Sequence, residues 1–174
     1  MPDRTPAKTT NLDRYGSDAL PWSRAHDLLS KALTGPDLTH FLGTVGPDCR
    51  PHVAAVGAAW LDGDFYFTTS LAARKARNLA TNPACTIAVK AEGIDLTLTG
   101  TAERVSDAKT LERVAAIYRE AGWPAEQSSD ALTAPYSAPS AGPPPWHVFR
   151  FTFDKVVGVA TAEPNGATRW QFAR

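Results

Sequence analysis

The sequence FYFTTSLAARKARNLATNP, residues 65–83, is the most informative segment of this chain. Its first four residues predict a strand, a hydroxyl-rich corner follows, and a predicted helix ends before Pro83. Ser70 is a suitable N-cap for this helix, because its hydroxyl can accept a hydrogen bond from a free N–H of the first turn. Helical spacing then predicts one apolar face, formed by Ala72, Ala76, Leu79 and Ala80.

Three cations, Arg74, Lys75 and Arg77, occupy the first half of this predicted helix, where the helix dipole favours acidic side chains. No carboxylate lies between Asp64 and Glu92, so the local sequence does not offset their charge. Free N–H groups, hydroxyls and uncompensated cations at a helix N-terminus favour binding of an anion, above all a phosphate. The alternative is a solvated helix face with a chance excess of positive charge.

Composition limits the other possibilities. A chain of 174 residues fits one domain with its own core, and 18 basic against 18 acidic residues give no global field for nucleic acid or a membrane surface. Cys49 and Cys85 lie far apart without metal-like spacing, which indicates a reducing compartment. The N-terminus is polar and the longest clearly apolar run is residues 53–61, so we expect no signal peptide, no membrane span and a cytoplasmic protein.

Apolar or alternating runs between turn residues predict a mainly β fold. The predicted strands are residues 37–46, 51–61, 64–68, 84–91, 94–106, 147–153 and 155–161, the last two forming a hairpin with its turn at residues 154–155. The second strand consists mostly of Ala, Gly and Val. Such small side chains either let a flat group approach the backbone or let another element pack closely.

Residues 1–20 are expected to be a flexible arm, and residues 21–174 a single domain. Residues 21–34 and 107–121 are predicted helices with one apolar side each. Between 122 and 146, six of the 25 residues are proline, which excludes a helix or a central strand. This Pro-rich loop contains the aromatic residues Trp123, Tyr136 and Trp146. They favour a loop that covers a site as a lid, although they could equally fasten the loop to the barrel.

Several chemistries lack their motifs. The sequence has no GxGxxG or GxxxxGK[ST] nucleotide motif, no HExxH or paired His/Cys spacing for a metal, and no GxSxG nucleophile motif. An enzyme without reactive side chains of its own has to take its chemistry from a cofactor. We therefore expect no metal and no catalytic side chain, which agrees with a phosphate site.

The chain resembles the pyridoxamine 5′-phosphate oxidase-like proteins, which bind flavin or deazaflavin in a split β-barrel. The resemblance extends from about residue 38 to 105, with a weaker match near the C-terminus. Its motifs are GTVGPDCRPHVAAV, FYFTTS, ARKARNLATNP and LTGTAERVS. It implies a split β-barrel with flanking helices that works as a homodimer, with the cofactor between the two subunits.

The resemblance also implies a cofactor site. The strand matching Val53, Ala54, Ala55 and Val56 would lie along the ring system, and the phosphate or ribityl chain would be held by Thr68, Thr69, Ser70, Arg74 and Lys75. Arg77, about one turn past Arg74, is a candidate for a longer anionic tail. The substrate pocket is expected to contain His52, Trp60, Trp123, Trp146 and Trp170.

The sequence departs from true pyridoxamine phosphate oxidases. Their Arg and Lys on the second strand are missing from residues 54–59, Asp95 replaces a glutamine, and their C-terminal basic motif is reduced to Arg169 and Trp170. KARNL instead resembles the branch that uses coenzyme F-420 as often as FMN. The expected activity is hydride transfer between F-420, slightly favoured, or FMN and a small apolar or aromatic substrate. The alternatives are a non-catalytic flavin- or haem-binding protein and an interaction protein with an empty site.

Overall fold

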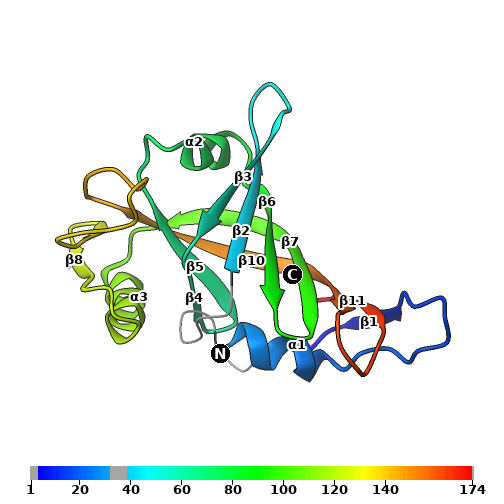
Figure 1. Ribbon diagram of the computed structural model, residues 1–174. Coiled ribbons are helices and arrows are strands. Elements are labelled where there is room, and N and C mark those ends of the chain that lie inside the picture. Colours follow the sequence, from blue (N-terminus) through cyan, green and yellow to red (C-terminus); the bar gives the residue numbers. More distant parts are fainter. Residues whose placement is uncertain (1–3, 32–38, 174) are drawn as a thin grey trace.

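The computed structural model describes residues 4–31 and 39–173, which form a mainly antiparallel β structure with helices at its margins (Figure 1). The helices of this part are α1 (Trp22–Leu29), α2 (Arg74–Thr81) and α3 (Ala108–Glu120). The main sheet contains β1 (Lys8–Asn11), β2 (Thr39–Val45), β3 (Pro51–Val56), β4 (Ala58–Leu61), β5 (Asp64–Thr69), β6 (Ala84–Ala91), β7 (Ile94–Val105), β10 (His147–Ala160) and β11 (Ala167–Gln171). A separate small hairpin comprises β8 (Glu126–Ser128) and β9 (Ala131–Thr133).

Strand β10 joins the two parts of the barrel. It pairs with β7 along both of its halves, while its first half also pairs with β5 and its second half with β11. The predicted hairpin at residues 154–155 is therefore wrong, because the chain continues through this point as one strand. The register against β7 shifts between Phe153 and Lys155, and such a bulge lets a strand bend without ending.

The predicted strand over residues 51–61 is divided in two. β3 pairs with β2, whereas β4 pairs with β5, and the break falls at Gly57. This break transfers the chain from one ladder of the barrel to another. The mainly β, split-barrel class predicted from the sequence is confirmed, although this division was not predicted.

The N-terminal segment differs from the expected flexible arm. β1 pairs with β11, and the side chain of Arg4 forms an ion pair of 2.9 Å with Asp64. This strand was not predicted, because it is short and its partner lies at the other end of the chain. Helix α1 ends at Leu29, before the predicted end at residue 34; residues 32–34, and the first two residues of the predicted strand at 37–46, lie outside the described part.

Two apolar clusters lie on opposite faces of β5. Phe65 and Phe67 belong to the larger cluster inside the barrel, while Tyr66 points to a smaller cluster beneath α3. The apolar side of the helix predicted over residues 107–121 is confirmed in α3. The four residues that form this side are buried: Leu111, Val114, Ala115 and Tyr118. Helix α3 therefore covers the outer side of β4 and β5 (Figure 1).

A buried histidine predicts how stability depends on pH. His40 of β2 is almost completely buried beside Phe65, and burial lowers its pKa from 6.5 to about 4. Between these pH values the unfolded chain binds a proton that the folded chain does not, so stability falls as the pH decreases from 6.5 to 4. Through this group we expect a loss of about 3 kcal/mol in the free energy of unfolding.

The measurement is urea unfolding of the wild type and of His40→Leu at pH 8, 6.5, 5 and 4. The variant should lose less stability than the wild type below pH 6.5, and the difference between the two should be constant above it. Parallel curves for the two proteins over the whole range would contradict the assignment.

Candidate functional site

A cavity of about 510 Å³ lies where β3 and β5 end and α2 and α3 come closest to the Pro-rich loop. The strand ends contribute small or hydroxyl-bearing residues to its wall: Ala55, Val56, Gly57, Thr68, Thr69 and Ser70. The turn before α2 contributes Ala73, α2 itself contributes Lys75, and α3 contributes Tyr118 near its C-terminus. A volume of this size is ordinary for a small-molecule or cofactor site.

The hydroxyl-rich corner makes a turn before the helix begins. Helix α2 starts at Arg74 with Ala73 at its N-cap, so the prediction that Ser70 caps it is wrong. The Ser70 hydroxyl instead accepts a hydrogen bond of 3.2 Å from the backbone N–H of Ala72. The later start places Arg74 and Lys75 in the first turn, where free N–H groups and the positive end of the helix dipole lie.

The buried face of α2 is narrower than expected. Ala76 and Leu79 are buried, but Ala72 and Ala80 are exposed, and the third buried residue of the helix is the polar Asn78. The buried side of this eight-residue helix therefore consists of two apolar residues and one polar residue.

Lys75 is the one charged side chain among the described residues that line the cavity. It is partly buried, and desolvation lowers its pKa. No carboxylate of the described lining neutralises it, so an anion entering the cavity would compensate the desolvated ammonium group. The cavity therefore suits a ligand with one anionic end.

The other two cations of the helix lie outside the cavity wall. The Arg77 guanidinium donates a hydrogen bond of 2.8 Å to the carbonyl oxygen of Ala72, and Arg74 is exposed. His52, also outside this wall, has a pKa lowered by desolvation and by the charges of Arg74 and Lys75, which places both cations near β3. Of the residues expected along the ring system, Ala55 and Val56 line the cavity, whereas Val53 and Ala54 do not.

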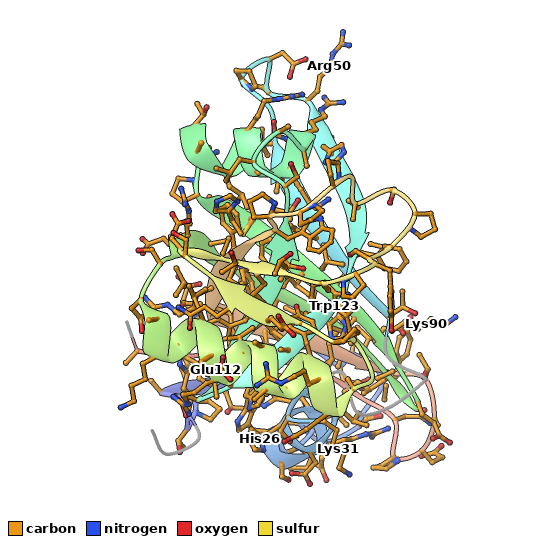
Figure 2. The ribbon with its side chains drawn as sticks, turned by 90° about the vertical axis from the view of Figure 1, so that its left-hand side faces the viewer. His26, Lys31, Arg50, Lys90, Glu112 and Trp123 are labelled. Carbon is orange, nitrogen blue, oxygen red and sulfur yellow. The ribbon has the colours of Figure 1, made fainter. Side chains whose placement is uncertain are left out.

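The opposite wall of the cavity is aromatic and belongs to the Pro-rich loop. Trp123, Tyr136 and Trp146 line it, and the indole rings of the two tryptophans lie 5.6 Å apart. The Trp123 Nε1–H donates to the carbonyl oxygen of Tyr136 at 2.6 Å, and the Tyr136 hydroxyl donates to that of Gly122 at 3.2 Å. These two bonds hold the loop across the face between α2 and α3, where Figure 2 shows Trp123.

Two of the tryptophans expected in the substrate pocket are elsewhere. Trp170 is fully buried in the larger core cluster, where its ring lies edge-on to that of Trp22 with the ring centroids 5.5 Å apart. Trp60 packs on Phe65 with the ring centroids 5.0 Å apart. Neither lines the cavity. An aromatic residue near a predicted strand does not reveal from sequence alone whether it faces a core or a site.

Some residues that line the cavity were not predicted as site residues from the sequence. Tyr118 was assigned only to the apolar face of its helix, and Ser137 and Ser140 of the loop showed no pattern. Burial raises the pKa of Tyr118, and its hydroxyl donates to the carbonyl oxygen of Gly57 at 2.9 Å, where β3 gives way to β4. Tyr118 thus fixes the strand break that forms the floor of the cavity.

The described part of the chain offers neither a metal cluster nor a membrane-spanning helix. No group of three or more His, Cys, Asp and Glu side chains in residues 4–31 and 39–173 is placed to hold a metal ion. Likewise, no helix within these residues is long and apolar enough to cross a membrane.

Fold and cavity together define a split β-barrel protein with a cavity at the start of a basic helix, lined there by Lys75. A family model described as pyridoxamine 5′-phosphate oxidase matches residues 31–160, which is most of the chain. The chain therefore belongs to the pyridoxamine 5′-phosphate oxidase family. No curated protein matches it in sequence.

Solved structures agree with this fold. A pyridoxamine 5′-phosphate oxidase-related, FMN binding protein from Nostoc punctiforme PCC 73102 is 19% identical with a TM-score of 0.57, over 91% of this chain and 93% of that one. An F420 reductase is 23% identical with a TM-score of 0.50, over 72% and 94%. A heme binding protein from Mycobacterium smegmatis is 20% identical with a TM-score of 0.53, over 79% and 55%. At these identities the similarity shows the fold.

The Tyr118 hydroxyl gives a testable prediction. Tyr118→Phe removes a hydroxyl that lies within hydrogen-bond distance of the carbonyl oxygens of Gly57 and Tyr66, the second of these contacts being buried, and should lower the free energy of unfolding by about 1–2 kcal/mol. Tyr136→Phe is the matched control, because it removes a hydroxyl whose bond to Gly122 is exposed, and it should cost less than about 0.5 kcal/mol. Urea unfolding measures both variants, and equal losses would contradict a structural role for the buried bond.

Proposed function

We propose that this protein is an oxidoreductase that transfers a hydride between FMN or coenzyme F-420 and a small apolar or aromatic substrate. The observation that supports this most is the combination of one partly desolvated cation, Lys75, with hydroxyls at the strand ends and an aromatic wall opposite. One end of the cavity suits a phosphate, and the other suits flat apolar groups.

The residues present fit such a cofactor. Lys75 and the free N–H groups at the start of α2 would hold the phosphate, while Thr68, Thr69 and Ser70 would contact the phosphate or the ribityl hydroxyls. The small residues 55–57 leave their backbone accessible to a flat ring.

When bound, the cofactor would supply the atom that accepts or donates the hydride. The chain would supply binding, orientation and exclusion of water. Trp123, Tyr136 and Trp146 cover the cavity and reduce the access of water to a bound ring. Because its pKa is raised, the Tyr118 hydroxyl stays protonated, and it donates its hydrogen bond to the carbonyl oxygen of Gly57. We therefore assign it no acid–base step.

Haem or flavin binding without turnover is the alternative. The heme binding protein from Mycobacterium smegmatis shares the fold. However, the described residues that line the cavity include no histidine, cysteine or methionine, which are common axial ligands of haem iron. Reduction of bound cofactor by an added hydride donor, followed by its reoxidation by a second compound, would favour the oxidoreductase over a binding protein.

We also propose that the protein works as a twofold homodimer through β2 and β3. Among the described strands, β3 pairs with β2 alone and therefore lies at an edge of the main sheet, and Val53 on it is 63% exposed. Phe41 and Val45 on β2 are the other exposed apolar side chains of this pair. A second copy covering this surface would close an apolar patch that a monomer leaves in water.

Light scattering tests this proposal. The wild type should be a dimer at micromolar concentration, and Val53→Glu should shift it to a monomer, because a carboxylate would be buried in the interface. Tyr15→Glu is the control: this side chain is 98% exposed on the loop after β1 and should not affect assembly. A wild-type monomer at every workable concentration, or a dimer unaffected by Val53→Glu, would contradict the proposal.

The anion site predicts which cation matters. Lys75→Ala should weaken FMN and F-420 binding by roughly 1.5–3 kcal/mol, the scale of a hydrogen bond to a charged group. Lys90→Ala, which removes an exposed cation of β6 that does not line the cavity, should leave both affinities unchanged. Fluorescence titration of the cofactor-free protein measures the affinities, and equal results for the two variants would refute the site.

The same titration separates the two cofactors. F-420 continues past its phosphate into a carboxylate-rich tail, which gives Arg77 a possible partner beyond the carbonyl of Ala72. If F-420 binds at least tenfold tighter than FMN and Arg77→Ala costs it about 1 kcal/mol alone, the deazaflavin is the cofactor. If FMN binds tighter and Arg77→Ala affects neither ligand, FMN takes its place.

A further inference from the structure

Helix α2 has little local stabilisation. It is eight residues long, it has no side-chain hydrogen bond at its N-cap, and it has no acidic residue in its first turn. Its first four residues instead include Arg74, Lys75 and Arg77, which the helix dipole disfavours at this end. Isolated helices of this length are marginal in water, so contacts with the rest of the protein must hold α2 in place.

One of these contacts is a buried hydrogen bond to strand β2. The Asn78 side-chain Nδ2 donates to the Thr44 Oγ1 at 3.0 Å, and the two residues are 3% and 2% exposed. Breaking this bond would leave an amide group or a hydroxyl buried without its partner, which is unfavourable. The bond is directional, unlike the apolar contacts of Ala76 and Leu79, and therefore also limits rotation of the helix about its own axis.

The same bond lies on the side of α2 that carries two of its cations. Lys75 and Arg74 precede Asn78 by three and four residues, so they share its side of the helix. Thr44 pairs with His52 across the β2–β3 ladder, and directly opposite residues of an antiparallel pair share a face of the sheet. The charges of Arg74 and Lys75 contribute to the lowered pKa of His52, which puts the basic side of the helix over this strand pair.

We infer that Asn78 and Thr44 are positioning residues, whose hydrogen bond orients α2 so that Lys75 points into the cavity and can meet the anionic group of the ligand. This inference rests on the proposed function for the identity of the ligand. Neither residue lines the cavity. Their effect on binding must therefore pass through the helix and be confined to the charged end of the ligand.

The test compares FMN with riboflavin, which has the same ring and ribityl chain without the phosphate. F-420 and its phosphate-free deazaflavin form the equivalent pair. The wild type should bind the phosphorylated compound at least about tenfold tighter than its partner. Thr44→Val replaces the hydroxyl with a methyl of similar size and should reduce this preference about fivefold, leaving riboflavin affinity within about twofold of the wild type.

Two variants serve as controls. Thr44→Ser keeps a hydroxyl at this position and should restore most of the preference. Thr168→Val removes another buried hydroxyl, the acceptor of the Leu20 backbone N–H at 2.7 Å. It should lower stability but leave both affinities unchanged. Hydrogen exchange of the α2 amides should be faster in Thr44→Val than in Thr168→Val, whether or not a cofactor is bound.

The possible failures are distinguishable. A wild type that binds FMN and riboflavin equally, and likewise the deazaflavin pair, would refute the anion site of the proposed function and this inference with it. A wild-type preference that Thr44→Val retains would refute the positioning role alone. The same holds if Thr44→Val weakens both members of a pair equally, since that result would show a general structural effect, or if Thr168→Val reduces the preference as much.

Discussion

The architecture depends on β10 pairing on both of its edges. One edge binds β7 along both halves of the strand, and the other is shared between β5 and β11. A strand that pairs with three partners in a curved sheet has to bend, and the bulge between Phe153 and Lys155 provides the bend. Because β5 is held at this point, its C-terminal hydroxyls arrive next to α2, and the cavity forms between them. The position of the cavity thus depends on a backbone irregularity in residues that do not line it.

The elements that local periodicity defines were predictable. The alternation in β6 and β7 and the apolar side of α3 are properties of neighbouring residues, and the structure shows them where the sequence placed them. The errors concern pairing across long distances. The division at Gly57, the unbroken course of β10 and the addition of β1 to β11 are set by partners far away in the sequence. An apolar run looks the same whether its ladder partner changes halfway or not.

Some of the residues that line the cavity were singled out from the sequence, where charge and hydroxyl groups gave a signal. Lys75 and the hydroxyls of residues 68–70 lie together at the cavity because only a short connection separates the end of β5 from the start of α2. The cap at Ser70 was wrong, because an extra turn before Arg74 is not visible in residue preferences. Trp60 and Trp170 were placed in the pocket although they belong to the core, and Tyr118 was placed only in the core although it also borders the cavity.

The five tryptophans fall into two groups with different surroundings. Trp22, Trp60 and Trp170 belong to the packing of the larger core, whereas Trp123 and Trp146 border the cavity. Intrinsic fluorescence of this protein is consequently a sum of two reporters. The core group responds to loss of tertiary packing, whereas the cavity group would be quenched by the ring system of the proposed cofactor. Replacing both Trp123 and Trp146 by Phe would therefore leave a form whose emission comes from the core group alone and records unfolding separately from ligand uptake.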